Sequence, residues 1–286
     1  MPKLYLNVSK ERKAFKKSLG QANHFLITAL VGLDYIRNNN VKCPEDFSTS
    51  WNPKNKSFSV DRSRQYILNS SMAWAVDCLD AYFSRCNQNP KLIENKMLLD
   101  KINGTRRSVN EKLMTFVEYL GIEIEEFGIY VSMAALAIQW RNNTMHFGAH
   151  NTIDVIYREK LLDSEGRIKD LFCGLDIIKT LNSFEKGKDP TFKEVTSLIR
   201  GIHRLVEMVD LRLLSEIDIN RYAHDIINHH FKKYKLTYKS VLALPSDKRN
   251  TKILNILTNN SFSYDKRYEK SQLIDIDDII SSWEKQ

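Results

Sequence analysis

The hexapeptide Arg141-Asn142-Asn143-Thr144-Met145-His146 brings together side chains whose types and spacing suit phosphate chemistry. Imidazole titrates near neutral pH and can therefore take up or release a proton during a reaction. A guanidinium stays charged and can hold a phosphate through two parallel hydrogen bonds, which stabilises charge that develops in a transition state. We therefore expect His146 to transfer protons and Arg141 to bind phosphate. Asn142 lies four residues before His146, on the same helical face, and is expected to orient the imidazole.

These groups match the needs of RNA cleavage without a metal ion. The 2′-hydroxyl of RNA attacks the neighbouring phosphorus once a base removes its proton, and a bound cation stabilises the charge that builds up. The sequence therefore predicts RNA as the substrate and no cofactor. Asp225 and His229 share a helical face, but no third metal ligand follows at a usual spacing. That face is better explained by RNA contact or by solvation.

The hexapeptide ends a helix that we predict over residues 124–145. The helix has an apolar stripe made of Phe127, Val131, Ala134 and Ile138. The next position in this series is Arg141, and a charge there is costly to bury unless it is paired or faces a polar cavity or a partner. Asp77 or Asp80, on a preceding helix, can supply the opposite charge.

Arg141 and His146 are separated by five residues, which is about 140° around a helix axis and roughly 7.5 Å along it. In a straight helix we expect that the two side chains cannot converge on one small group. Either the helix is distorted near Gly148, or a second copy of the chain supplies the complementary residues across a two-fold axis. The second possibility predicts a homodimer with a composite active site.

An Arg and a His at this spacing arise readily by chance, so the surrounding sequence decides what the pair means. Here the Arg is followed by Asn at the end of a long apolar helix. In that context the segment resembles the HEPN superfamily (higher eukaryotes and prokaryotes nucleotide-binding), whose signature is Arg-x4–6-His, often with Asn after the Arg. Arg141, Asn142 and His146 match it, and the resemblance also covers the general helical layout of residues 10–215.

The resemblance implies a metal-independent endoribonuclease that acts as a dimer, of the kind found in toxin–antitoxin and antiviral defence systems. It therefore adds an antitoxin or another defence-system protein as an expected partner. One branch of the superfamily is silenced by adenylylation of a Tyr two residues after the His. Gly148 occupies that position here, so this mode of control is not expected.

Four residues near the signature are expected to contact RNA or to support the site. His150 follows the hexapeptide by one turn, and Asn143 lies within it. Trp140 precedes Arg141 and can stack on a base, although a role in the core or in a dimer interface is also open. Asp77 is expected to support Arg141 as its ion-pair partner.

The chain as a whole is expected to be all-α, because ten Gly and six Pro are few for 286 residues. Apolar residues that step by threes and fours predict long helices over residues 9–38, 62–86 and 192–213, and a shorter one over 111–120. Residues 41–60 are expected to be a loop. Residues 151–174 lose helical periodicity, and Thr152–Tyr157 suits a short strand or an extended loop.

We expect a bundle of four to six long helices over residues 1–218, followed by a smaller basic helical extension over residues 219–286. The net charge is +6 over residues 1–60 and +4 over residues 219–286. Basic ends suit a polyanionic partner such as nucleic acid, although plain solubility explains them as well. The stretch Lys232–Lys252 can likewise track a phosphate backbone or form a solvated face. The last apolar residues, Ile276 to Trp283, are expected to fold back on the bundle.

The four cysteines show no paired spacing, and the longest apolar stretches fall short of the roughly 20 residues that span a bilayer. The sequence begins without a secretory signal. We therefore expect a cytoplasmic protein with no membrane partner. The alternative to a ribonuclease is a non-catalytic helical subunit that binds nucleic acid or a protein, with Arg141 in a structural ion pair.

Overall fold

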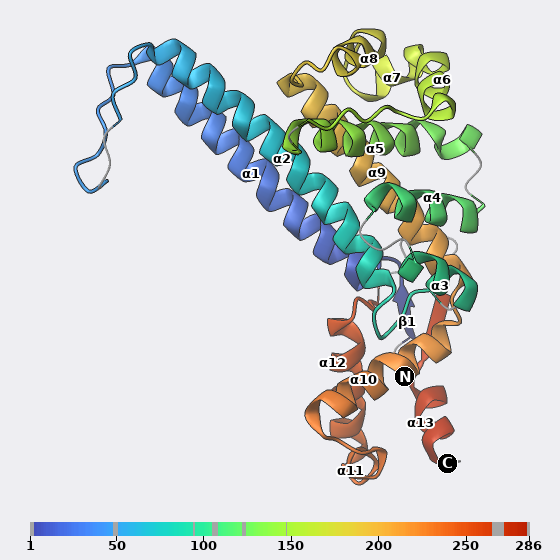
Figure 1. The fold of residues 1–286 in the computed structure, drawn as a ribbon. Helices are drawn as coiled ribbons and strands as arrows, with labels where there is room; N and C mark the ends of the chain where they lie inside the picture. The colour runs from blue at the N-terminus through green and yellow to red at the C-terminus, as the bar shows by residue number, and fades with distance from the viewer. Residues whose placement is uncertain are drawn as a thin grey trace. The chain divides into compact units, whose positions relative to one another are not determined.

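The computed structural model describes residues 3–47, 51–93, 95–104, 108–121, 124–146, 148–264 and 272–284. Within these ranges the chain forms thirteen helices and one small sheet, which confirms the all-α prediction (Figure 1). None of the helices in these ranges is long and apolar enough to cross a membrane. The elements are β1 (Lys3–Leu6), α1 (Lys10–Asn38), α2 (Lys56–Cys86), α3 (Lys96–Gly104), α4 (Val109–Tyr119), α5 (Ile124–Met145), α6 (Val155–Asp163), α7 (Glu165–Leu171), α8 (Ile177–Glu185), α9 (Phe192–Glu216), α10 (Ile219–Tyr234), α11 (Tyr238–Leu242), α12 (Ser246–Asn259), β2 (Gln272–Asp275) and α13 (Ile276–Glu284).

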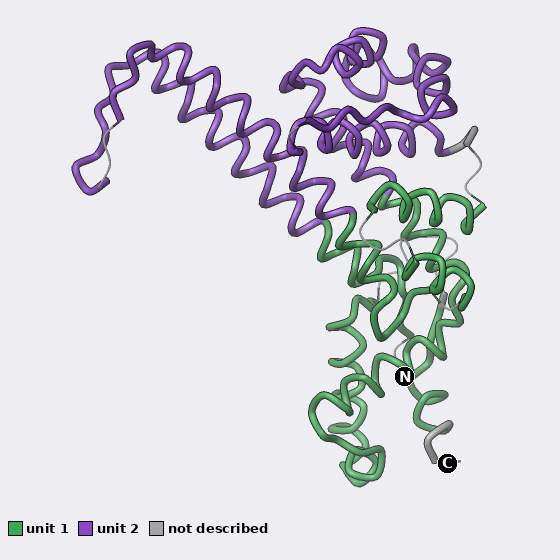
Figure 2. The backbone as a smooth tube through the Cα atoms, in the orientation of Figure 1, with its two compact units in different colours: residues 1–15, 80–121, 206–286 green, residues 16–79, 122–205 purple. Residues whose placement is uncertain are grey.

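The chain divides into two compact units, each made of segments that are discontinuous in sequence (Figure 2). Unit 1 contains residues 1–15, 80–121 and 206–286, and unit 2 contains residues 16–79 and 122–205. Residues 206–286 therefore belong to the same compact unit as residues 1–15 and 80–121. The division into a bundle over residues 1–218 and an extension over residues 219–286 stays a prediction.

Unit 2 contains the larger part of an antiparallel hairpin formed by α1 and α2 (Figure 1). Contacts between the two helices hold them in this antiparallel arrangement, among them the ion pair of Arg64 Nη1 with Asp34 Oδ1 at 2.9 Å. Trp74 Nε1 donates to the Ser18 carbonyl oxygen at 3.3 Å near the other end of the same helices. α2 begins six residues earlier than predicted, because Asn55 Oδ1 accepts from the Phe58 amide at 3.0 Å and so caps the helix start.

The centre of unit 2 is α5, whose ends agree with the prediction. Residues 131–138 are all buried, so the helix is covered on every side and not along one stripe only. α9 passes close to it at Gly201. A Cβ atom added there would lie 2.7 Å from the Cβ of Met133, so a glycine is needed for the two backbones to approach this closely.

Most of the segment after the hexapeptide is helical although it lacks helical periodicity, so the expectation of a strand or an extended loop is wrong for residues 155–157. Asp154 Oδ1 accepts from the Ile156 amide at 3.0 Å and caps α6, which takes in the second half of the expected Thr152–Tyr157 strand. α7 follows it directly. Helices of seven to nine residues are too short to show a clear 3.6-residue period, and they are stabilised by caps and tertiary packing instead.

Unit 1 pairs the two ends of the described chain in an antiparallel sheet, with Leu4 opposite Ile274. Strands of four residues carry too little alternation to be recognised in the sequence, and neither was predicted. α13 follows β2 and buries Ile276, Ile279 and Ile280 within unit 1, where it contacts α12 and β2. A contact of this segment with the bundle of residues 1–218 stays a prediction. The side chain of Trp283 lies outside the described residues.

A buried polar network joins α1, α2 and α9 within unit 1. The Asp210 carboxylate accepts from the Ser9 amide at 3.1 Å, from the Ser9 hydroxyl and from Tyr82 Oη at 3.2 Å. Burial raises the pKa of Asp210 despite these hydrogen bonds. Burial also raises the pKa of Glu11 to about 7, and the nearby charge of Asp210 adds to the effect.

Candidate functional site

The hexapeptide forms the last turn of α5 in unit 2. The His146 amide donates to the Asn142 carbonyl oxygen at 3.1 Å, which continues the helical pattern to its end. Gly148 then takes a φ of +74°, a left-handed conformation that favours glycine and ends the helix. His146 is consequently exposed at the C-terminal end of α5.

The guanidinium of Arg141 contacts three side chains. Nη2 donates to Asp77 Oδ1 at 3.0 Å, and Nη1 donates to Asn142 Oδ1 at 3.1 Å. Nη1 also lies 3.5 Å from His146 Nε2. Of the two acidic residues that the sequence left open, Asp77 is therefore the partner of Arg141, because Asp80 pairs with Lys112 Nζ at 2.6 Å instead.

The expectation that Arg141 and His146 cannot converge in an undistorted helix is wrong. α5 stays helical through Met145, so the backbone is not distorted to bring them together. The axial separation applies to the backbones only, and the long flexible side chain of Arg141 spans it. A second copy of the chain is not needed for this contact, and the homodimer stays a prediction.

The contact with Arg141 constrains the proton positions on His146. A guanidinium has donors only, so the Nε2 atom that faces it acts as an acceptor and carries a lone pair. The matching tautomer is a neutral imidazole with its proton on Nδ1. A separation of 3.5 Å is at the long end for a hydrogen bond, so the contact is weak and easily exchanged for a ligand. Asn142 meets Arg141 and is not seen to orient the ring.

Arg141 stands where the buried part of α5 reaches the surface. Its side chain is 22% exposed and that of Asp77 is 58% exposed, so the charged ends meet near solvent. The Nε atom of Arg141 is buried and has no hydrogen-bond partner among the described residues. The aliphatic part of the Arg141 side chain is thus buried with the apolar helix, and its guanidinium is paired with Asp77 near solvent.

Asn143 fixes the loop that follows α5. Its Oδ1 accepts from the backbone amide of Asn151 at 2.6 Å, and its Nδ2 donates to the Asn151 carbonyl oxygen at 2.9 Å. The side-chain amide is therefore occupied in holding the loop, which carries His150 at an exposed position. The role of Asn151 could not be predicted, because no sequence pattern relates two residues that are eight apart across a loop.

Trp140 belongs to the core of unit 2. It is 1% exposed, and its Nε1 donates to the Lys188 carbonyl oxygen at 3.0 Å. Its ring packs edge-on against Phe184 at 5.7 Å between centroids. The indole therefore has no face open to a base, and of the roles that the sequence left open the core role is the one observed.

Comparisons with known proteins add nothing to this geometry: no family model, curated protein or solved structure matches the chain. Over the described ranges, no three His, Cys, Asp or Glu side chains are grouped so as to hold a metal ion. What the site offers is an exposed imidazole with a lone pair on Nε2, beside a guanidinium that is held by one carboxylate and one amide. Such a pair can bind an anion and accept a proton next to it.

Proposed function

We propose that this chain is a metal-independent endoribonuclease in which His146 is the general base and Arg141 binds the scissile phosphate. The observation that carries the proposal is the 3.5 Å approach of Arg141 Nη1 to His146 Nε2 at an exposed helix end. It puts an anion-binding group and a proton acceptor next to each other, as cleavage by an internal hydroxyl requires.

In the proposed reaction His146 Nε2 takes the proton of the 2′-hydroxyl of RNA. The 2′-oxygen forms a bond to the adjacent phosphorus while the bond from phosphorus to the 5′-oxygen breaks, and the leaving oxygen takes a proton from water or a second acid. The products carry a 2′,3′-cyclic phosphate and a 5′-hydroxyl. The Arg141 guanidinium stabilises the charge on the phosphoryl oxygens. DNA lacks the nucleophile and is not cleaved.

A phosphate that binds Arg141 must share or replace Asp77. Both terminal nitrogens of the guanidinium already donate to side chains, and Nε is buried. Asp77 is the more readily displaced partner because more than half of its side chain is exposed. The Arg141–Asp77 pair is thus the resting state of the proposed phosphate site.

The experiment is incubation of the purified protein with single-stranded RNA, with and without EDTA, followed by analysis of the product ends. We expect chelator-resistant cleavage that leaves cyclic phosphates and that falls at least about a hundredfold in His146→Ala and in Arg141→Ala. His24→Ala, which removes an exposed histidine of α1, is the matched control and should cleave normally. If folded His146→Ala and Arg141→Ala proteins degrade RNA as fast as the wild type, the proposal is wrong.

We extend the proposal to a homodimer that acts as a toxin or an antiviral-defence effector, with an antitoxin or another defence-system protein as partner. This extension is supported only by the match of Arg141, Asn142 and His146 to the HEPN signature. A dimer would also bring a second imidazole, which a single hexapeptide does not supply, to act as the general acid.

One observation favours a second function, that of a non-catalytic subunit that binds nucleic acid or a protein. Arg141 joins α5 to Asp77 of α2 with its Nε buried, as a structural ion pair would. RNA binding without cleavage, together with loss of thermal stability in Arg141→Ala, would favour this alternative.

A further inference from the structure

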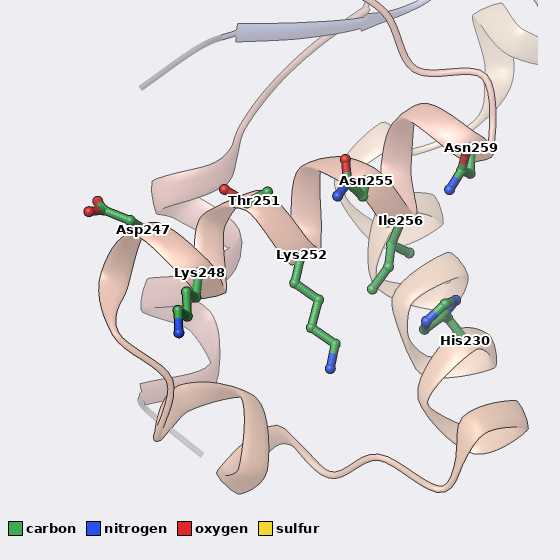
Figure 3. A pocket seen from close by; sticks show the side chains of 8 residues that line it. All are labelled: His230, Asp247, Lys248, Thr251, Lys252, Asn255, Ile256 and Asn259. Atoms are coloured by element: carbon green, nitrogen blue, oxygen red, sulfur yellow. The ribbon is translucent and has the colours of Figure 1, made fainter.

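A second polar surface lies within unit 1, between α10 and α12 (Figure 3). α10 begins at a cap in which Asp218 Oδ1 accepts from the Asn220 amide at 2.9 Å, and α12 packs against it through the buried side chains of Ile253 and Leu257. Between the two helices is an open cavity of about 460 Å³. We call it the α10–α12 groove; its lining residues are His230, Asp247, Lys248, Thr251, Lys252, Asn255, Ile256 and Asn259.

Two rows of side chains run along α12 beside the groove, because residues four apart share a helical face. One row holds two cations, Lys248 and Lys252, and Figure 3 shows both projecting from the same side of the helix. The neighbouring row holds one carboxylate, one hydroxyl and two amides, on Asp247, Thr251, Asn255 and Asn259. The groove therefore offers a line of positive charge next to groups that can both donate and accept hydrogen bonds.

Positive charge in the α10–α12 groove is not balanced by ion pairs. Neither Lys248 nor Lys252 has an ion-pair partner among the residues that the structure describes. Asp247 also lines the groove, but Figure 3 shows its side chain directed away from the two lysines. Burial lowers the pKa of His230 on α10, and the charges of Lys252 and Lys233 lower it further. Cations gathered in this way attract an anionic ligand.

An exposed aromatic ring stands at the end of α10 next to the groove. Tyr234 is 56% exposed, and its ring centroid lies 4.5 Å from that of His230, which lines the groove. The Nζ atom of Lys233 lies 5.5 Å from the same ring. A ring that is open to solvent and lies beside a cation is suited to stack on a nucleic-acid base while that cation meets a phosphate.

We propose that the α10–α12 groove binds single-stranded RNA. Lys248 and Lys252 contact successive phosphates, the amide row contacts sugars and base edges, and Tyr234 stacks on a base. An acidic peptide could use the lysines but not the stacking ring, which is why RNA is favoured. The choice of RNA also rests on the proposed function, yet the groove uses no residue of the hexapeptide and adds a second contact site, in unit 1.

The test measures binding of a fluorescently labelled oligouridine of about 16 nucleotides to full-length His146→Ala protein, which holds RNA without cutting it. In this background, Lys248→Gln/Lys252→Gln should weaken binding about tenfold and lower the slope of log affinity against log salt by about 1.4, or about 0.7 for each lost phosphate contact. The matched control is Lys13→Gln/Lys17→Gln, two exposed lysines with the same spacing on α1. It should change the affinity less than about twofold.

Stacking is tested separately with Tyr234. Tyr234→Ala should weaken binding about fivefold or more, whereas Tyr234→Phe keeps the ring and should bind like the parent. Equal affinities for the groove double variant and the Lys13/Lys17 control would overturn the proposal, provided that thermal melts show both to be folded. Cleavage by the His146 protein is scored independently. Cleavage without groove-dependent binding refutes only the groove, and groove-dependent binding without cleavage refutes only the ribonuclease.

Discussion

Arg141 Nη1 and His146 Nε2 lie 3.5 Å apart at the end of α5, and the same guanidinium is held by Asp77 from α2 at 3.0 Å. The imidazole lone pair therefore faces a cation whose other side is neutralised by a displaceable carboxylate. A phosphodiester of bound RNA would compete with Asp77 for the guanidinium. The 2′-hydroxyl of the adjoining ribose would then lie toward His146. Whether Asp77 hinders or helps this exchange can be measured.

Replacing Asp77 by Asn removes the competing charge and keeps an oxygen that can accept from Arg141. We expect RNA to bind about threefold more tightly, as a lower KM with an unchanged kcat, because a phosphate no longer displaces a carboxylate. The stability should change by no more than about 1 kcal/mol, since the substituted Asp77 side chain is more than half exposed. Asp34→Asn, which breaks the similar Arg64 pair on the same hairpin, is the control and should leave KM unchanged. A folded Asp77→Asn protein with a much lower kcat would show instead that the carboxylate positions Arg141.

Mixing two inactive variants tests whether one chain holds the whole Arg–His pair. Because both side chains meet within one chain, a mixture of Arg141→Ala and His146→Ala proteins should stay inactive after denaturation and joint refolding. The measurement is RNA cleavage by the mixture against equal amounts of each variant and of refolded wild type. Recovery to about a quarter of the wild-type rate or more would mean that Arg and His act across a composite dimer site.

The sequence predicted the main helices because their signals are local. Apolar stripes located α5 and α9, and the helix predicted over residues 111–120 corresponds to α4, which ends at Tyr119. α6 and α7 were missed because their few residues are held by caps such as Asp154 and by burial of side chains such as Leu161 and Ile168. Strands β1 and β2 were missed because the pairing joins residues about 270 apart.

The candidate site was predicted by residue type but not by geometry. The sequence named Arg141, His146 and Asp77, yet helical spacing alone placed the first two on different faces. The two side chains meet because the Arg141 side chain is long and because α5 ends at Met145, just before His146. The spacing of the two residues in the sequence shows neither feature. Asn143 was named for RNA contact, whereas its amide holds the Asn151 backbone, which only the folded loop reveals.

The buried acids of unit 1 predict how stability depends on pH. The pKa of Glu11 is raised by burial from 4.5 to about 7, so the folded state holds this proton more tightly than the unfolded state. Its stabilising contribution is full below pH 4.5 and is lost as the pH rises through 7, up to about 3 kcal/mol. The raised pKa of Asp210 acts in the same direction. Denaturant unfolding between pH 5 and about 8 should therefore show falling stability, with most of the fall below pH 7.

Glu11→Gln should flatten that dependence, because an amide cannot ionise in the buried site. Glu216→Gln, at the exposed end of α9, provides the control and should leave the pH dependence of stability as in the wild type. If the Glu11→Gln protein lost stability as steeply as the wild type over the same pH range, burial of Glu11 would not be the cause.

The approach of α9 to α5 gives a prediction with a matched control in the same chain. At Gly201 a Cβ atom would lie 2.7 Å from the Cβ of Met133, so Gly201→Ala must push two helix backbones apart. We expect a loss of about 1–3 kcal/mol in the free energy of unfolding, as overpacked cores show. At Gly20 on α1 no atom lies within 4 Å of the added Cβ, so Gly20→Ala should be neutral or stabilise by up to about 1 kcal/mol through helix propensity. Denaturant unfolding of both variants tests this prediction. Equal changes in the free energy of unfolding at the two glycines would mean that α9 and α5 do not meet at Gly201.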